Sequence, residues 1–248
     1  MIYANTDIGF TRETNQDAFN TGTYPDGNEW VIVCDGMGGV SGGHIASRIC
    51  VEKVSEAIER GYRNKMTVNS VKNMLVSAIT GANAAIFEEA QKSFEYKGMG
   101  TTVVVAVKLG GVAVIAHVGD SRAYLVNVAN ETITQITKDH SFVQILIDTG
   151  KITEEEATVH PDRNIITRAV GIENFVDVEV DIVDVNNGDM LLLCTDGLCG
   201  YLSDGAVLEV IKKYGADSVE KLIESANDSG GFDNVTVAII SAENQGEQ

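Results

Sequence analysis

The chain has 248 residues, 44% of them hydrophobic, enough to bury the core of one large domain or two small ones. Its 18 basic residues face 36 acidic ones, and a net charge of −18 disfavours nucleic-acid partners, which bind through basic patches. No apolar run approaches the roughly 20 residues of a membrane helix, and the start lacks the basic and apolar segments of a signal peptide, so neither membrane insertion nor secretion is expected.

The composition favours one continuous domain over residues 1–242. Only 2 prolines occur, and there is no Pro/Ser-rich linker, charge block or internal repeat. The Glu/Gln-rich residues 243–248 are expected to form a disordered tail. The 4 cysteines include no CxxC pair, so reduced thiols and a cytoplasmic location are expected, and we expect a monomer.

The first third of the chain reads as strands followed by two helices. Strands are predicted over residues 2–9, 17–23 and 30–34. A glycine-rich segment, 36–43, then leads into a helix whose apolar face holds Ala46, Cys50, Val54 and Ala57 at helical spacing. A second helix has a similar apolar stripe between residues 71 and 86.

The middle of the chain has the pattern of two β-hairpins. Residues 101–109 and 112–118 are predicted to pair through Gly110-Gly111, and residues 121–128 and 132–136 through Asn130. Asp139 is predicted to cap a helix that runs to residue 147. Thr153 and Glu156 fit a capping box for a short helix, and residues 159–168 are predicted to be a loop or flap.

The last third is predicted to mix strands and helices. Strands are expected over 176–183, 190–194 and 235–241, and helices over 203–213 and 217–228, the second with a capping box of Asp217 and Glu220. Consecutive hairpins favour antiparallel sheets, and paired long helices suggest layers that cover them. A regular βαβ alternation is absent, which disfavours a Rossmann-type sheet, so the pattern favours the α+β class.

Four aspartates follow apolar, strand-like runs and adjoin glycine or asparagine. They are Asp35, Asp120, Asp196 and Asp233. Each one alone is typical of a turn, but their joint pattern suggests carboxylates aimed from rigid positions into an acidic pocket for hard cations. The glycine after Asp35 and after Asp196 allows a sharp turn and a backbone carbonyl ligand. Magnesium and manganese suit such oxygen ligands.

Zinc and calcium fit this sequence less well than magnesium or manganese. Arg12 adds a possible binding residue for a phosphate group. The four histidines show no HExxH or Cys/His pairing for zinc, and no DxDxDG loop for calcium occurs. Arg12 lies in a polar loop between two predicted strands, where its guanidinium could bind phosphate in a bidentate fork. A surface ion pair is the alternative role for this arginine.

Seven short motifs stand in the order found in the metal-dependent protein Ser/Thr phosphatases, the PPM or type 2C family, and the chain resembles their short bacterial form over about residues 5–240. The motifs are Arg12-Glu-Thr-Asn-Gln-Asp17, Asp35-Gly-Met-Gly-Gly39, Gly100-Thr-Thr102, Val118-Gly-Asp-Ser-Arg122, Asn164-Ile-Ile-Thr-Arg-Ala169, Cys194-Thr-Asp-Gly-Leu198 and Asp233-Asn-Val-Thr236. The resemblance implies a four-layer αββα sandwich, in which two antiparallel sheets are flanked by helix pairs.

The resemblance also implies a metal centre of two Mn²⁺ or Mg²⁺ ions. Asp35 would bridge the ions, the carbonyl of Gly36 would bind one, and Asp196 and Asp233 would bind the other. Asp120, together with Asp196, would hold a weaker third ion.

Further roles are implied for residues around the metals. Arg12 would grip the substrate phosphate, Asp17 would act through metal-bound water, and Asn234 would brace Asp233. Residues 159–168 match a mobile flap beside the site, and this flap includes Val159, His160, Asn164 and Arg168.

The implied reaction is hydrolysis of phosphoserine and phosphothreonine on proteins by a metal-bridging hydroxide, in opposition to a bacterial Ser/Thr kinase that would itself be among the substrates. Many eukaryotic relatives have histidine after Asp-Gly, as a proposed acid for the leaving group, where this chain has Met37. A metal-bound water or His140 could supply the proton instead, although His140 is also a typical histidine near a helix start.

Two other functions fit the sequence less well. A pseudo-phosphatase that only binds phosphoproteins would be expected to lack metal positions, whereas Asp35, Asp196 and Asp233 are all present. A two-metal nuclease is disfavoured by the net charge of −18 and the lack of a basic groove.

Overall fold

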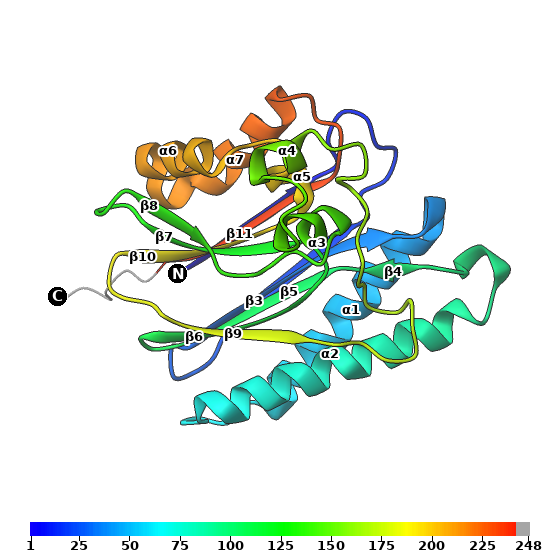
Figure 1. Cartoon of the computed structure of the whole chain (residues 1–248). Helices are drawn as coiled ribbons and strands as arrows, with labels where there is room; N and C mark the ends of the chain where they lie inside the picture. The colour runs from blue at the N-terminus through cyan, green and yellow to red at the C-terminus, as the bar shows by residue number, and fades with distance from the viewer. Residues whose placement is uncertain (242–248) are drawn as a thin grey trace.

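The computed structural model describes residues 1–241, apart from the side chains of residues 40, 41 and 216, so the predicted tail at 243–248 lies outside the described residues. Two antiparallel sheets lie face to face, and helices cover their outer faces (Figure 1). The predicted α+β class and the implied four-layer sandwich are therefore confirmed.

The strands and helices have the following bounds. The strands are β1 (Ile2–Asp7), β2 (Asp17–Thr23), β3 (Glu29–Met37), β4 (Gly100–Thr101), β5 (Val103–Leu109), β6 (Val112–Val118), β7 (Arg122–Asn127), β8 (Thr132–Gln135), β9 (Glu179–Asp184), β10 (Asp189–Cys194) and β11 (Val235–Ser241). The α-helices are α1 (Gly39–Gly61), α2 (Val68–Ala90), α3 (Phe142–Asp148), α4 (Glu154–Thr158), α5 (Asp196–Cys199), α6 (Asp204–Tyr214) and α7 (Ser218–Asp228). Two 3₁₀ turns are η1 (Phe94–Tyr96) and η2 (Gly215–Asp217).

One sheet has the strand order β1-β11-β10-β7-β8, and the other β2-β3-β5-β6-β9, with β4 paired to β3. The long helices α1 and α2 pack on the second sheet, and α6 and α7 pack on the first (Figure 1). In α1, Ala46, Cys50 and Val54 are fully buried at four-residue spacing, as the sequence predicts, so a single face of this helix enters the core.

The central strands β3 and β10 contribute to two cores at once. In β3, Trp30 and Ile32 pack toward α1 and α2, whereas Val31 and Val33 pack between the two sheets. Strand β10 alternates in the same way between the α6/α7 side and the inter-sheet core. Because both faces are covered, these strands read as unbroken apolar runs, and they form the rigid base from which Asp35 and Asp196 project.

Two predicted helix caps are wrong. Helix α3 is capped by Ser141, whose hydroxyl accepts the Gln144 N–H. Asp139 does not cap this helix because its carboxylate accepts bidentate hydrogen bonds from Arg122, at 2.7–3.1 Å. Asp217 precedes α7 without a side-chain cap, so the capping box predicted there is absent. The capping box of Thr153 and Glu156 is confirmed at the start of α4.

Several element ends also differ from the prediction. Strand β3 does not end before Asp35 but continues to Met37, because Gly36 and Met37 pair with Thr101 and Gly100 of β4. Strand β9 begins at Glu179, three residues later than predicted, and the short helix α5 was not predicted.

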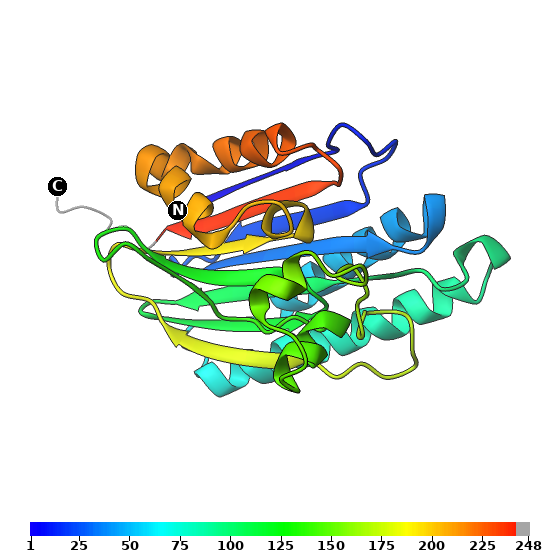
Figure 2. The same ribbon diagram turned by 45° about the horizontal axis from the view of Figure 1, so that its top comes forward.

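The residues predicted as a flap, 159–168, form no regular element and continue from α3 and α4. Figure 2 shows the two short helices, in light green, projecting together from the sandwich. We call residues 142–166 the flap segment. Its base is attached where Ser141 bridges to Ile166 and the Thr167 N–H donates to the His140 carbonyl, at 2.7 Å.

Candidate active site

A cleft of about 530 Å³ brings the four predicted carboxylates together. Asp35 comes from β3, Asp120 from the loop after β6, Asp196 from the first residue of α5, and Asp233 from the turn before β11. Arg12, from the loop between β1 and β2, also lines the cleft. The cleft therefore collects carboxylates from both sheets.

Asp35 is fixed by the threonines of the Gly100-Thr-Thr102 motif. Its N–H donates to the Thr102 hydroxyl at 2.9 Å, and its carbonyl accepts hydrogen bonds from the Thr101 hydroxyl and the Thr102 N–H, both at 2.8 Å. The Thr102 hydroxyl also lies 2.7 Å from that of Ser121, next to Asp120. Thr102 thus links the segments that carry Asp35 and Asp120. Thr102 is part of a sequence motif, but the sequence predicts no role for it.

Gly36, the predicted carbonyl ligand, lies where strand β3 and helix α1 touch. A Cβ at Gly36 would lie 2.1 Å from the carbonyl oxygen of Gly43, so only glycine allows this approach. The Gly36 N–H donates to the Gln16 carbonyl at 3.1 Å. The glycine-rich segment therefore closes the wall of the cleft beside Asp35.

Asp17 lies opposite Asp35 in the β2–β3 pairing and is buried. Its Oδ2 accepts hydrogen bonds from the hydroxyls of Thr195, at 2.9 Å, and Thr236, at 2.7 Å. Its other oxygen, Oδ1, is buried and has no hydrogen-bond partner among the described residues. Burial, and then the charges of Asp196 and Asp233, raises the pKa of Asp17 to about 7.

The clustered carboxylates disfavour each other's charge. Burial, and then the charges of Asp17 and Asp196, raises the pKa of Asp35 well above its ordinary value. Burial and the charge of Asp196 raise the pKa of Asp120 to about 8. Burial, and then the Asp233 charge, also raises the pKa of Asp196. Such a group is stable in its ionised form only beside positive charge.

The donor set fits hard divalent cations. Asp196, like Asp17, has a buried Oδ1 with no partner in the described part of the chain, so carboxylate oxygens face the cleft without protein donors. Among the side chains that the structure describes, no histidine or cysteine of the kind that zinc favours lines the cleft, whereas carboxylate and carbonyl oxygens suit magnesium and manganese. Asp35, Asp196 and Asp233, with the Gly36 carbonyl, would hold such ions.

Arg12 and Asn234 join the loop of the first motif to the start of the last motif. The Arg12 guanidinium donates to Asp233 at 2.7 Å, so the predicted phosphate ligand forms an ion pair in this structure. The Asn234 side chain accepts the Gln16 N–H at 2.8 Å and donates to the Ile8 carbonyl at 2.9 Å. Asn234 contacts Asp233 through its backbone N–H, at 2.9 Å, and not through its amide.

The predicted flap residues divide into two groups. Asn164 lines the cleft, and so does Met37, which is not part of the flap. Val159 and His160 do not line it: Val159 ends α4 and is 77% exposed, and the His160 ring lies against Phe142. Arg168 is directed away, with its guanidinium 2.7 Å from Glu179.

Comparison with known proteins agrees with this geometry. The family model described as "Protein phosphatase 2C" matches residues 11–230. The serine/threonine phosphatase stp of Listeria innocua is 37% identical over 237 residues, which cover 95% of this chain and 93% of that protein. The chain belongs to the protein phosphatase 2C family.

Solved structures of this family have the same fold. The serine/threonine phosphatase Stp1 from Staphylococcus aureus superposes with a TM-score of 0.91 at 38% identity, covering 98% of this chain and 95% of that one. The catalytic domain of the protein phosphatase PstP, in complex with two manganese ions, superposes with a TM-score of 0.83 at 33% identity and 96% coverage of each chain. Within residues 1–241, none of the helices is long and apolar enough to span a membrane.

Proposed function

We propose that this protein hydrolyses phosphoserine and phosphothreonine on other proteins, with two Mn²⁺ or Mg²⁺ ions held in the acidic cleft. The family and the names of the relatives support the reaction class. The observation that carries the proposal is the convergence of Asp35, Asp196 and Asp233 with Arg12 on one cleft. An anionic cluster next to an arginine suits cations and a phosphoryl group together.

Each residue has a role that follows from its place. Asp35 shares the cleft with Asp120 and Asp196 and would contact both core ions, with the Gly36 carbonyl on one and Asp196 and Asp233 on the other. Asp120, with Asp196, would hold a weaker third ion. When bound, such ions lower the pKa of coordinated water and offset charge on phosphoryl oxygens.

The other polar residues would orient and hold. Arg12, exposed at the mouth of the cleft, would exchange its bond with Asp233 for phosphate oxygens, because its fork of donors matches them. The free Oδ1 of Asp17 would accept a hydrogen bond from a water in the cleft, while its Oδ2 stays fixed by Thr195 and Thr236.

The proton for the leaving alkoxide would come from water in the cleft. Met37 lines the cleft but carries no acidic proton. His140, the other candidate, is buried outside the cleft, with its ring hydrogen-bonded to Gly119 and paired with Glu179. We therefore assign no acid role to His140.

We further propose a single monomeric catalytic domain over residues 1–242 that acts in the cytoplasm, with phosphoprotein substrates that include a Ser/Thr kinase. The test uses the purified protein with a phosphothreonine peptide and p-nitrophenyl phosphate, with Mn²⁺, with Mg²⁺ and with excess chelator. The proposal predicts turnover of both substrates that requires the metal. Full activity in chelator, or no turnover in excess Mn²⁺, would refute it.

A further inference from the structure

A second cavity, of about 490 Å³, adjoins the acidic cleft. Met37 and Ile166 line both cavities, so the two share one wall. The other lining residues all come from the segment 167–177, which leads from the base of the flap segment toward β9. We call this second cavity the flanking pocket.

The walls of the flanking pocket combine exposed apolar side chains with charged ones, namely two carboxylates and Arg168. Ile172 is 38% exposed and Phe175 is 84% exposed, which is unusual for large apolar side chains beside a cavity. Glu173 and Asp177 add carboxylates to the same pocket. The Asp177 side chain is 82% exposed and lies 3.6 Å from Arg168.

We infer that the flanking pocket binds the substrate residues next to the phosphorylated serine or threonine, and that it prefers an apolar residue followed or preceded by a basic one. This inference rests on the proposed function. An extended peptide advances roughly 3.3 Å per residue, so neighbours two to four residues from the phosphate reach beyond the shared wall. An apolar side chain would cover Phe175 and Ile172, and a basic one would pair with Asp177.

The test compares Phe175→Ala with Phe94→Ala. Phe94 is 89% exposed and lines neither cavity, so it is the matched control. The substrates are a phosphothreonine peptide with leucine and arginine within three residues of the phosphate, the same peptide with both replaced by alanine, and p-nitrophenyl phosphate, which is too small to reach the pocket.

We expect Phe175→Ala to lower kcat/KM for the leucine/arginine peptide, relative to p-nitrophenyl phosphate, by roughly 5- to 20-fold, whereas Phe94→Ala keeps the wild-type ratio. Wild type should prefer that peptide over the alanine peptide by a similar factor. An equal ratio in Phe175→Ala and wild type, or an equal loss in Phe94→Ala, would overturn the inference. Hydrolysis of p-nitrophenyl phosphate without turnover of any phosphopeptide would overturn the proposed function as well.

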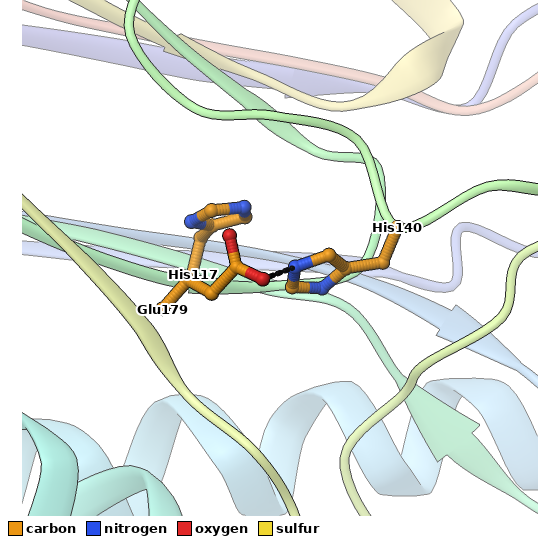
Figure 3. A group of neighbouring side chains, drawn as sticks. All are labelled: His117, His140 and Glu179. Carbon is orange, nitrogen blue, oxygen red and sulfur yellow. Dashed lines mark ion pairs between the residues drawn. The ribbon is translucent and has the colours of Figure 1, made fainter. Parts of the chain in front are cut away.

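A second inference comes from a separate cluster, outside the cleft. Figure 3 shows the Glu179 carboxylate beside the rings of His117 and His140, with a dashed line to the His140 ring, and possible ligand atoms of the three residues lie within 4.8 Å of one another. The two rings stack with centroids 4.7 Å apart. The ligand types are those of a zinc site, so the hydrogen bonds must decide what the cluster does.

The hydrogen bonds of the His140 ring indicate a hydrogen-bonded network rather than a zinc site. The Gly119 N–H donates to Nδ1 of His140 at 3.1 Å, so the proton of the neutral ring is on Nε2, which lies 3.1 Å from a Glu179 oxygen. The Arg168 guanidinium is 2.7 Å from the same oxygen and supplies positive charge there. Burial, and then His117 and Arg168, lowers the pKa of His140 and favours this neutral form.

His140 thereby connects two functional segments. The backbone N–H of His140 donates to the Gly119 carbonyl at 2.9 Å, and the Gly119 N–H donates to the His140 ring, so the two residues exchange two hydrogen bonds. Gly119 has φ of +108° and directly precedes Asp120, so this turn sets where the Asp120 carboxylate points. The His140 carbonyl accepts the Thr167 N–H at the base of the flap segment.

We propose that His140 is a positioning residue that fixes the Gly119–Asp120 turn and the base of the flap segment together. Through it, the cation-binding carboxylate of Asp120 and the flap segment share one anchor, with Glu179 and Arg168 holding the far side of the ring. Only the role of Asp120 as a ligand involves a cation. The hydrogen bonds of His140 with Gly119 and Thr167 form without a bound ion.

The test compares His140→Ala and His140→Asn with His160→Ala. Asparagine places an oxygen near the position of Nδ1 and keeps an acceptor for the Gly119 N–H, but it does not reach Glu179. His160, in the flap segment and outside the cluster, is the control. The exchange rate of the Gly119 backbone amide, measured by NMR, reports on its hydrogen bond to His140 whether or not metal is bound. Mn²⁺ titration reports the affinity of the weakest binding step.

We expect the Gly119 amide to exchange at least 10-fold faster in His140→Ala, and the weakest Mn²⁺ step to weaken by a similar factor. His140→Asn should recover both, while its Thr167 amide exchanges faster than in wild type. Wild-type exchange of Gly119 in His140→Ala, or the same changes in His160→Ala, would overturn the proposal. Stoichiometric Zn²⁺ binding that His117→Ala abolishes would overturn the hydrogen-bonded assignment, because Nδ1 of His117 is buried without a partner among the described residues.

Discussion

Gly197 offers a sharp test of how the cleft is built, because it lies where the segment that carries Asp196 meets the segment that carries Asp233. It is the second residue of α5, and a Cβ there would lie 1.9 Å from the carbonyl oxygen of Asn234 and 3.1 Å from Cα of Val235. Ordinary contact begins at 3.4 Å, so the first contact is about 1.5 Å too short. Both contacts are with backbone, which cannot rotate away, so Gly197→Ala must push α5 from the start of β11.

The balance of energies sets the sign of the effect. Alanine is favoured over glycine in a helix by about 0.5–1 kcal/mol. Overpacking typically costs about 1–3 kcal/mol, and here the clash is large and with backbone, so we expect a net loss of about 1–2 kcal/mol in the free energy of unfolding. The shift also separates Asp196 from Asp233, and Mn²⁺ affinity should fall at least 10-fold.

Gly81→Ala is the matched control. Gly81 lies within α2, it is exposed, and nothing lies within 4 Å of an added Cβ. This variant should gain about 0.5–1 kcal/mol and bind Mn²⁺ like wild type. Urea unfolding in chelator and calorimetric Mn²⁺ titration give both quantities. A Gly197→Ala variant with wild-type stability and wild-type Mn²⁺ affinity would refute the close approach of α5 and β11.

Three further variants or conditions test the acidic cluster. Asp35→Asn should lose nearly all turnover and keep its circular-dichroism spectrum, and turnover equal to wild type would remove Asp35 from the site. Asp120→Ala should keep two tightly bound Mn²⁺ ions and lose the weaker third, which calorimetry would contradict with an unchanged ion count. Burial raises the pKa of Asp17 to about 7 and that of Asp120 to about 8, so the folded metal-free protein holds protons that the unfolded chain releases. Its free energy of unfolding, measured in chelator, should therefore fall as the pH rises from 7 to 8, and saturating Mn²⁺ should reduce this fall; a rise in chelator would speak against ionised, mutually repelling carboxylates.

The main carboxylates could be found from the sequence because their signal is local. An apolar run followed by Asp-Gly appears within a few residues, and for Asp196 it reflects the doubly buried strand β10. The surroundings of Asp17 could not be found in this way. Its two hydroxyl partners, Thr195 and Thr236, come from the far end of the chain, and only the packed sheets bring them to it.

The errors have the same origin. Aspartate is a typical helix-capping residue, but the carboxylate of Asp139 accepts hydrogen bonds from Arg122, which lies on strand β7. Strand β3 extends beyond Asp35 because β4, more than 60 residues later, pairs with it. The propensities of neighbouring residues carry no information about partners from distant parts of the chain, and contacts with such partners override these propensities.

The central claim is that Asp35, Asp196 and Asp233 hold a binuclear metal centre, with a weaker third ion beside Asp120, and crystals grown with Mn²⁺ test it most directly. Anomalous diffraction at the manganese edge locates the ions without reference to activity. The account predicts two strong peaks in the cleft, within ligand distance of Asp35, Asp196 and Asp233, and a weaker third peak beside Asp120. An empty cleft, or manganese found only between His117, His140 and Glu179, would contradict it.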